Sequence, residues 1–259
     1  MGRQIKIKAT LKQNVNKAFR LQSKLFSIIH KNSSTKNIPV IINNFNRLQY
    51  LQQQVAWLLQ CGHKNIHIID NASTYMPLLD YYKKAPATIY RLDRNLGHEA
   101  FWRTHLFQRF GKSYHVYTDP DVLPEADTPA DFMEYFMSIL KRYPQTDKVG
   151  FGLKTDDLPD HYPKKKQVID WETALLKNEI APGIFKARID TTFALYRPGK
   201  AFQCWDATLR TGAPYLLKHM PWYEDPENLS AETIHYLQTA SASSSWYQAV
   251  KNGNTQYPG

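Results

Sequence analysis

The sequence has few cysteines, no long apolar run and no acidic residue before position 70. Its two cysteines, Cys61 and Cys204, form no C-x-x-C pair, which excludes a disulfide scaffold and a cysteine zinc site. No stretch approaches the roughly 18 apolar residues of a membrane-spanning helix, and the start lacks the features of a signal peptide. Hydrophobic residues still make up 42% of the 259 positions, which indicates a folded domain with a sizeable core rather than a disordered chain.

Positive charge is concentrated at the start of the chain. The sequence holds 33 basic and 23 acidic residues, for a net charge of +10. Residues 1–37 contain nine of the basic residues and no acidic one, because the first carboxylate is Asp70. The rest of the chain therefore has 24 basic and 23 acidic residues and is nearly neutral. A nearly neutral body argues against nucleic acid as a partner, although the average charge alone would suggest one.

The basic segment 1–37 also has the periodicity of an amphipathic helix. Its apolar residues recur at helical spacing: Leu11, Val15, Ala18, Phe19, Leu25, Phe26 and Ile29. Most of its basic residues fall away from that stripe. One interpretation is a helix on an anionic membrane surface, which places a cytoplasmic protein at the inner face of the plasma membrane. The other is a helix docked on the body with a solvated basic face.

Residues 38–250 alternate between strand and helix patterns and are expected to form one domain, followed by a flexible tail at 251–259. Strands are expected at 38–42, 65–69, 88–92, 113–118, 149–153 and 189–196. Helices are expected at 47–60, 76–84, 98–110, 132–140, 171–177 and 231–239. Asp127 or Thr128 is expected to cap the fourth of these helices, and Ser230 the last. This order predicts an α/β fold with a mostly parallel sheet flanked by helices.

Two polar motifs follow expected strands, at the sheet edge where open α/β folds bind ligands. The first is Asp70-Asn71-Ala72-Ser73, in which the aspartate can accept hydrogen bonds from a nucleobase or cap a turn. The second is Asp93-Arg94-Asn95-Leu96-Gly97, in which Arg94 can meet a phosphate and Gly97 permits a tight turn. Each motif alone is common in loops.

A third motif, Tyr117-Thr118-Asp119-Pro120-Asp121, directly follows the fourth strand. Two carboxylates separated by one residue can share a hard divalent cation such as Mg²⁺ or Mn²⁺, which prefers oxygen ligands and leaves room for phosphate oxygens. A D-x-D pair that ends the fourth strand, after the two earlier motifs in order, is a stronger signal than a D-x-D pair alone.

Over residues 38–125 this order of motifs resembles the GT-A fold of nucleotide-sugar glycosyltransferases, most closely the bacterial enzymes of glycosyltransferase family 2. The resemblance implies that Asp70 contacts the nucleobase and that Asp119 and Asp121 bracket the ribose, the diphosphate and a Mn²⁺ or Mg²⁺ ion. It makes Asp121 the direct metal ligand and His219, by position alone, a third one. The remaining residues implied to line the nucleotide pocket are Asn43, Asn44, Arg94 and Asn95.

An inverting glycosyltransferase also needs a carboxylate that takes the proton of the acceptor hydroxyl. Three candidates lie in the second half of the chain: Asp225, Glu224 and Asp190. Asp225 is placed first, and for each of the three a helix cap or a surface carboxylate is the competing interpretation. The neighbouring Trp222 and Tyr223 are expected to bind the acceptor, because aromatic rings stack on sugar rings.

The sequence thus predicts an enzyme, a hexosyltransferase that moves a sugar from a nucleoside diphosphate donor, with UDP favoured, to a saccharide or lipid-linked acceptor. Inversion and a place in bacterial surface polysaccharide or glycolipid synthesis follow from the resemblance. A nucleotidyltransferase is one alternative, but the segment after the first strand, Asn43-Asn44-Phe45-Asn46-Arg47, lacks a glycine-rich phosphate loop. A non-enzymatic membrane-binding or RNA-binding protein is another, and it leaves the D-P-D loop unexplained.

Overall fold

The computed structural model describes residues 34–200 and 207–240. The helix expected in the basic segment falls almost wholly on residues 1–33, outside the described part of the chain, as does the tail at 251–259. Both therefore stay predictions. Within the described residues, no helix combines the length and the apolar character that crossing a membrane requires.

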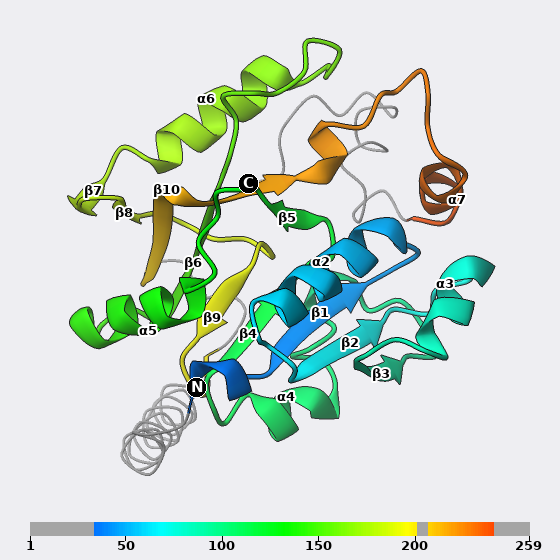
Figure 1. The fold of residues 1–259 in the computed structure, drawn as a ribbon, viewed down its shortest axis with the longest axis horizontal. Coiled ribbons are helices and arrows are strands. Elements are labelled where there is room, and N and C mark those ends of the chain that lie inside the picture. The colour runs from blue at the N-terminus through cyan, green and yellow to red at the C-terminus, as the bar shows by residue number, and fades with distance from the viewer. Residues whose placement is uncertain (1–33, 201–206, 241–259) are drawn as a thin grey trace, which may run out of the picture.

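A ten-stranded mixed sheet runs through the described part of the chain in the order β3-β2-β1-β4-β9-β6-β10-β8-β7, with β5 paired to β10 (Figure 1). Its first half is wholly parallel, as the alternation of strands and helices predicts. The strands of this half are β1 (Val40–Asn44), β2 (Ile66–Asp70), β3 (Thr88–Arg91) and β4 (His115–Thr118). Parallel pairing brings the carboxyl ends of all four strands, and the polar motifs that follow them, to one edge.

The second half of the sheet begins with a strand of opposite direction. Strand β9 (Ala194–Tyr196) pairs antiparallel with both β4 and β6 (Lys148–Leu153), so β6 again runs in the direction of the first four strands. Strand β10 (Thr208–His219) is parallel to β6 and carries His219 back to the edge where β4 ends. The remaining strands are β5 (Val122–Pro124), β7 (Glu179–Ala181) and β8 (Ile184–Lys186).

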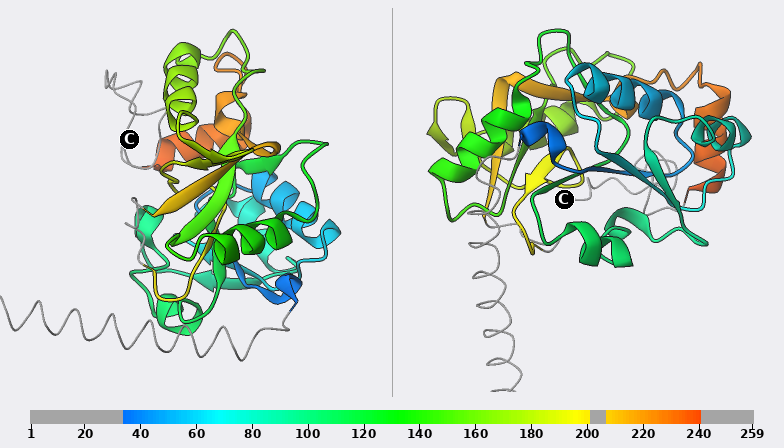
Figure 2. Two further views of the ribbon diagram at one scale, coloured as in Figure 1. Left: turned by 90° about the vertical axis from the view of Figure 1, so that its left-hand side faces the viewer. Right: turned by 60° about the horizontal axis from the view of Figure 1, so that its bottom comes forward.

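Helices cover both faces of the sheet, which Figure 2 shows from two further directions. They are α2 (Gln49–Gln60), α3 (Met76–Tyr82), α4 (His105–Phe110), α5 (Phe132–Arg142), α6 (Lys165–Leu175) and α7 (Ala231–Thr239). Successive strand residues point to opposite faces, and β1 is buried on both. Val40 and Ile42 belong to the core under α2 and α5, whereas Ile41 packs in the core that includes Leu106 of α4. The predicted fold class, an α/β sheet flanked by helices with most strands in one direction, is confirmed.

The boundaries of several elements differ from the prediction. The helix expected at 98–110 divides into the short helix η2 (Gly97–Glu99) and α4, with turns between them. Helix α5 begins after Asp131, and the Thr128 hydroxyl instead accepts a hydrogen bond from the Glu125 backbone at 3.0 Å. The cap of α7 is confirmed, because the Ser230 hydroxyl accepts a hydrogen bond from the Thr233 N–H at 3.1 Å.

Burial of His115 in β4 makes the stability of the fold depend on pH. The side chain is fully buried, its Nδ1 lies 3.0 Å from the Ser113 carbonyl, and no described residue is a partner of its Nε2. Burial lowers the pKa of His115 to about 4, against the weaker opposing effect of the Ser113 carbonyl. The folded protein therefore keeps this ring neutral where the unfolded chain already binds a proton, between the ordinary value near 6.5 and about 4.

Above pH 6.5 we expect protonation of His115 in the unfolded chain to have no effect on the free energy of unfolding. As the pH drops to 4, the free energy of unfolding should fall by up to about 3 kcal/mol. In a His115→Asn protein, whose amide can still donate to the Ser113 carbonyl but does not titrate, that part of the pH dependence should vanish. Urea unfolding at several pH values measures it. The exposed His161→Asn variant is the matched control, and an equally steep pH dependence in both variants would contradict the assignment.

Candidate functional site

The loops that follow β1, β2 and β3 are tied together by two asparagine side chains. Asn71 Nδ2 donates to Asn43 Oδ1 at 2.6 Å and to the Gly97 carbonyl at 3.2 Å, while Asn71 Oδ1 accepts from the Leu96 N–H at 3.0 Å. Asn43 Nδ2 also donates to the Gly97 carbonyl, at 3.3 Å. Gly97 has a φ of +70°, a left-handed conformation that favours glycine. These bonds hold the loop 93–97 against the ends of β1 and β2.

Asp70 at the end of β2 is fully buried and already has protein partners on both oxygens. Oδ1 accepts from the Tyr82 hydroxyl at 3.2 Å and from the Ser73 N–H at 3.3 Å, and Oδ2 lies 3.1 Å from Arg91 Nε. Asn44 joins the same network, because its Nδ2 donates to the Tyr82 hydroxyl at 2.8 Å. A carboxylate offers roughly four acceptor sites, so Asp70 has little capacity left for a nucleobase in this conformation. Its observed contacts shape the turn at 70–73.

The backbone of the D-x-D loop is fixed from two sides. The Asp119 N–H donates to the Thr191 carbonyl at 3.0 Å, and the Thr191 hydroxyl donates to Asp119 Oδ2. From the other side, Gln54 Nε2 of α2 donates to the carbonyls of Asp119 and Val122, each at 2.9 Å. Burial and the neighbouring Asp121 raise the pKa of Asp119 well above its usual range, while the hydrogen bond from Thr191 opposes them.

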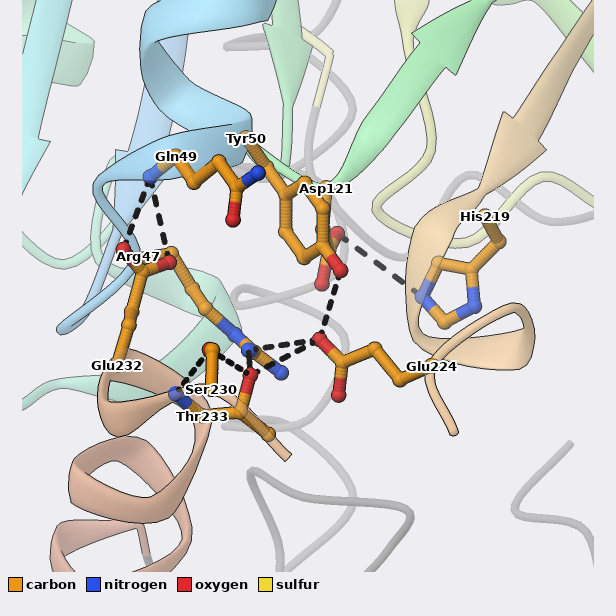
Figure 3. Close-up of polar contacts among 9 residues, drawn as sticks. All are labelled: Arg47, Gln49, Tyr50, Asp121, His219, Glu224, Ser230, Glu232 and Thr233. Carbon is orange, nitrogen blue, oxygen red and sulfur yellow. Dashed lines mark hydrogen bonds and ion pairs between the residues drawn. The ribbon is translucent and has the colours of Figure 1, made fainter. Parts of the chain in front are cut away.

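Asp121 faces His219, which the return of β10 brings to the same edge (Figure 3). The distance from Asp121 Oδ1 to His219 Nε2 is 3.9 Å, and the buried His219 Nδ1 has no hydrogen-bond partner within residues 34–200 and 207–240. Burial lowers the pKa of His219, and the Asp121 charge opposes this only in part. The imidazole is therefore neutral near pH 7, which is its metal-binding form. Among the described residues, no three acidic, histidine or cysteine side chains form a complete metal site by themselves.

A buried ion pair that the sequence did not reveal adjoins these residues. Arg47, from the loop after β1, donates through Nη1 to Glu224 Oε1 and to Thr233 Oγ1, each at 3.0 Å (Figure 3). The Tyr50 hydroxyl donates to the same Glu224 oxygen at 2.8 Å, and the Arg47 guanidinium lies 4.1 Å from the centre of the Tyr236 ring. Burial is the largest effect and would lower the pKa of Arg47, but the charge of Glu224, together with Tyr236, Asp121 and Tyr50, outweighs burial and raises it.

Carboxylates dominate the electrostatics of this region. Asp121, Glu224 and Asp190 all act on the pKa of His219 in the direction that favours its charge, and Asp121 and Asp190 both raise the pKa of Asp119. Arg47 is the cation among the principal charged neighbours of His219 within the described chain. A site with this excess of negative charge binds a cation more readily than a bare anion.

The three candidate bases lie in different surroundings. Asp225 is exposed, and its Oδ1 accepts from the Glu227 N–H at 2.9 Å, as a turn residue does. Glu224 is held by the ion pair. Asp190 lies in the loop before β9, not at the start of a strand as the sequence predicted. Its side chain is exposed and has no hydrogen bond or ion pair to the described residues, although its charge acts on Asp119 and His219.

The remaining expected residues fall into buried and accessible groups. Trp222 is 1% exposed and packs against the His219 ring at 4.8 Å, so in this conformation it offers no face to a sugar. Tyr223 is partly exposed, and its hydroxyl donates to Asp157 at 2.6 Å. Arg94 and Asn95 are exposed on the loop that Asn71 holds in place, where Asn95 Oδ1 accepts from the Gly97 N–H at 2.7 Å.

Comparison with known proteins gives fold likenesses only. No protein-family model matches the chain, and neither does any curated protein. The solved structure of S. aureus TarS 1-349 aligns at 12% identity and a TM-score of 0.39, covering 62% of this chain and 47% of that one. GalNAc-T7 with UDP, GalNAc and Mn²⁺ aligns at 16% and 0.45, covering 71% and 43%. An apo UDP-glucose pyrophosphorylase aligns at 10% and 0.41, covering 78% and 100%.

This chain thus spans less than half of the TarS and GalNAc-T7 chains. These scores are too low to transfer a function. The topology itself places the D-x-D loop directly after β4, at the edge where the parallel strands β3, β2, β1 and β4 end.

Proposed function

We propose that this protein is a metal-dependent glycosyltransferase that uses a nucleoside diphosphate sugar, with UDP favoured as the nucleotide. The observation that carries the proposal is the position of Asp121. It ends a rigid loop after β4, faces His219 at 3.9 Å and lies among further carboxylates at the ligand-binding edge of a parallel sheet. A nucleoside diphosphate bound at such an edge needs a cation, because its own charge has the same sign as the site.

The residues fit a Mn²⁺ or Mg²⁺ ion. Asp121 supplies an oxygen donor and His219 a neutral nitrogen. Asp119 belongs to the same loop and is separated from Asp121 by Pro120 alone. Proteins commonly bind such ions through one or two side chains together with substrate phosphates, so an incomplete protein-only ligand set is expected. When bound, the ion would act as a Lewis acid that stabilises the departing diphosphate.

The loops at the ends of β1, β2 and β3 are the proposed nucleotide pocket. Arg94 is free to approach a phosphate, and the asparagine pair Asn43 and Asn71 fixes the pocket wall behind it. Asp70 shapes this wall through its three protein contacts, and we keep base recognition by its remaining lone pair as part of the proposal.

Asp190 is the proposed general base, and the reaction is proposed to invert the anomeric centre. The backbone on both sides of Asp190 is fixed, because the Ile189 carbonyl accepts from Lys148 Nζ at 2.7 Å and Thr191 is bonded to Asp119. The Asp190 side chain is left available to accept the proton of the acceptor hydroxyl. Asp225 and Glu224 both have structural hydrogen bonds that compete with this role.

The proposed acceptor is a saccharide or a lipid-linked saccharide. Tyr223, half-exposed near the carboxylates, is the aromatic group that can stack on a saccharide. A lipid-linked acceptor, in surface polysaccharide or glycolipid synthesis, would give the basic segment 1–37 a role at an anionic membrane.

The direct test is a thermal-shift screen of UDP, GDP, CDP and dTDP sugars with and without MnCl₂. We expect one donor to raise the melting temperature only with the metal, since a ligand that binds the folded state stabilises it by mass action. The same donor should then release free nucleoside diphosphate when an acceptor is supplied. Stabilisation by nucleoside triphosphate and sugar phosphate instead would support a nucleotidyltransferase, and no response to any nucleotide would contradict the proposal.

A further inference from the structure

The ion pair between Arg47 and Glu224 uses only part of the hydrogen-bonding capacity of the arginine. Both described side-chain hydrogen bonds of Arg47 leave from Nη1, while Nε is buried and has no partner among the described residues. The arginine side chain is 5% exposed and that of Glu224 is 12% exposed. A buried N–H without a partner destabilises the folded state. Because a guanidinium fork is suited to bidentate pairing with an oxyanion, a single-point contact leaves this arginine under-satisfied.

A second buried pair shows that the unpaired Nε is not sufficient evidence of a site. Arg210 of β10 and Glu172 of α6 lie 2.8 Å apart, with exposed fractions of 3% and 6%, and Arg210 Nε likewise has no partner in the described part of the chain. This pair packs α6 against the sheet, and burial raises the pKa of Glu172 against the opposing charge of Arg210. The Arg210–Glu172 pair therefore has the same chemistry as the Arg47–Glu224 pair but different neighbours.

Arg47 differs from Arg210 in its place, because its partner Glu224 lies in one group of side chains with Tyr50, Asp121 and His219 (Figure 3). Its charge lowers the pKa of His219, and Asp121 is among the groups that raise the pKa of Arg47 itself. The Tyr236 ring, 4.1 Å from the guanidinium carbon, and the Tyr50 ring, 5.6 Å away, hold it in place. A cation held rigidly beside Asp121 and His219 lies where the diphosphate of a donor would be bound.

We propose that Glu224 occupies the binding position on Arg47 that the diphosphate of the donor takes when the donor binds. Before the donor binds, the carboxylate neutralises Arg47. When the donor binds, a phosphate takes over the guanidinium with two parallel hydrogen bonds. The exchange breaks the contact of Arg47 with Glu224 and forms contacts to phosphate oxygens, and no proton moves. The proposal rests on the proposed function, since it assigns Arg47 to the diphosphate of that donor.

Glu224 has other hydrogen-bond donors that remain when its contact with Arg47 breaks. Its Oε1 also accepts from the Tyr50 hydroxyl at 2.8 Å and from the Thr233 hydroxyl at 3.2 Å, so the carboxylate keeps two hydrogen bonds after the exchange. After transfer, Glu224 competes with the nucleoside diphosphate product for Arg47 and thereby favours its release. The Arg47–Glu224 pair thus lowers the affinity for the donor and speeds release of the product.

The test compares UDP binding, measured by calorimetry with MnCl₂, in wild-type, Glu224→Gln and Glu172→Gln proteins, with GDP, CDP and dTDP as further probes. The amide keeps the shape of the side chain but removes the competing charge. We expect Glu224→Gln to bind the nucleotide about tenfold more tightly, equivalent to about 1.4 kcal/mol, and Glu172→Gln to bind it as the wild type does. A merely structural role for Glu224 predicts weaker binding, so unchanged or weakened affinity overturns the exchange.

Arg47→Lys provides the second measurement, and it decides the matter if Glu224→Gln does not fold. Lysine can keep the pairing with Glu224 but lacks the fork, so UDP affinity should fall at least tenfold, and an unchanged affinity overturns the proposal. Wild-type protein that binds none of the four nucleotides contradicts the proposed function itself. If the wild type binds a nucleotide but the variants do not change as expected, the exchange is contradicted and the proposed function is not.

Discussion

Replacing Asp121 with alanine is expected to abolish the Mn²⁺-dependent part of UDP binding and to lower turnover on the order of 10³-fold, because a divalent ion contributes several kcal/mol at a departing diphosphate. The fold should survive. The one described polar contact of the Asp121 side chain is the 3.9 Å approach to His219, and the bond from the Met220 N–H ends on the Asp121 backbone carbonyl, which alanine retains.

Calorimetric titration of UDP with MnCl₂ and with EDTA separates the two parts of binding. Asp170→Ala is the control, since Asp170 is an exposed acid paired with Lys166 on α6 and lies outside the proposed site. The control protein should keep the full difference between the two titrations. An Asp121→Ala protein that keeps it as well would mean that the metal, if one binds, does not bind at the D-x-D loop.

Patterns of neighbouring residues predicted the first four strands and the D-x-D loop, because these elements depend mainly on local sequence. Strands β1 to β4 are short apolar segments between helices, and the Asp119-Pro120-Asp121 motif stands where the last of them ends, so its place at the edge of the sheet followed from parallel pairing. Strand β10 was not predicted. Residues Thr208–His219 include Gly212 and Pro214 and lack a regular apolar alternation, and pairing with β5, β6 and β8 makes them a strand.

The site residues that the sequence missed are defined by contacts between distant segments. Arg47 is 177 residues from Glu224 in the chain, and its neighbour Asn46 donates to Thr239, 193 residues away. No spacing rule connects such positions. The polar segment Asn43–Arg47 after a strand was the available signal, but only Asn43 and Asn44 were assigned to the nucleotide pocket and Arg47 was given no role. Trp222 shows the opposite error, because polar sequence neighbours suggested an exposed ring and the structure buries it.

The same reasoning changes the order of the candidate bases. Sequence placed Asp225 first because it neighbours aromatic residues, but its carboxylate serves the turn at Glu227. Asp190 was expected at the start of a strand. It instead lies in an irregular segment held at Ile189 by the buried Lys148 and at Thr191 by Asp119, with its own side chain unbonded to the described residues. A fixed backbone with a free carboxylate is the preorganisation that a general base needs.

An Asp190→Asn protein is therefore expected to lose about 10²–10⁴-fold in kcat while its affinity for UDP with MnCl₂ stays within a few-fold of the wild type. The amide preserves the shape of the side chain but cannot take up the proton of the acceptor hydroxyl.

Asp225→Asn distinguishes the two assignments. If Asp190 is the base, the Asp225 variant should transfer sugar at a rate close to the wild type, since asparagine can still accept the hydrogen bond from the Glu227 N–H. Initial rates with both variants at saturating donor, together with UDP calorimetry on the same samples, give the required comparison. A large loss of kcat in Asp225→Asn with near-normal turnover in Asp190→Asn would reverse the assignment. A loss of UDP affinity in Asp190→Asn equal to its loss of turnover would instead place Asp190 in donor binding, because the charge of Asp190 already acts on Asp119 and His219.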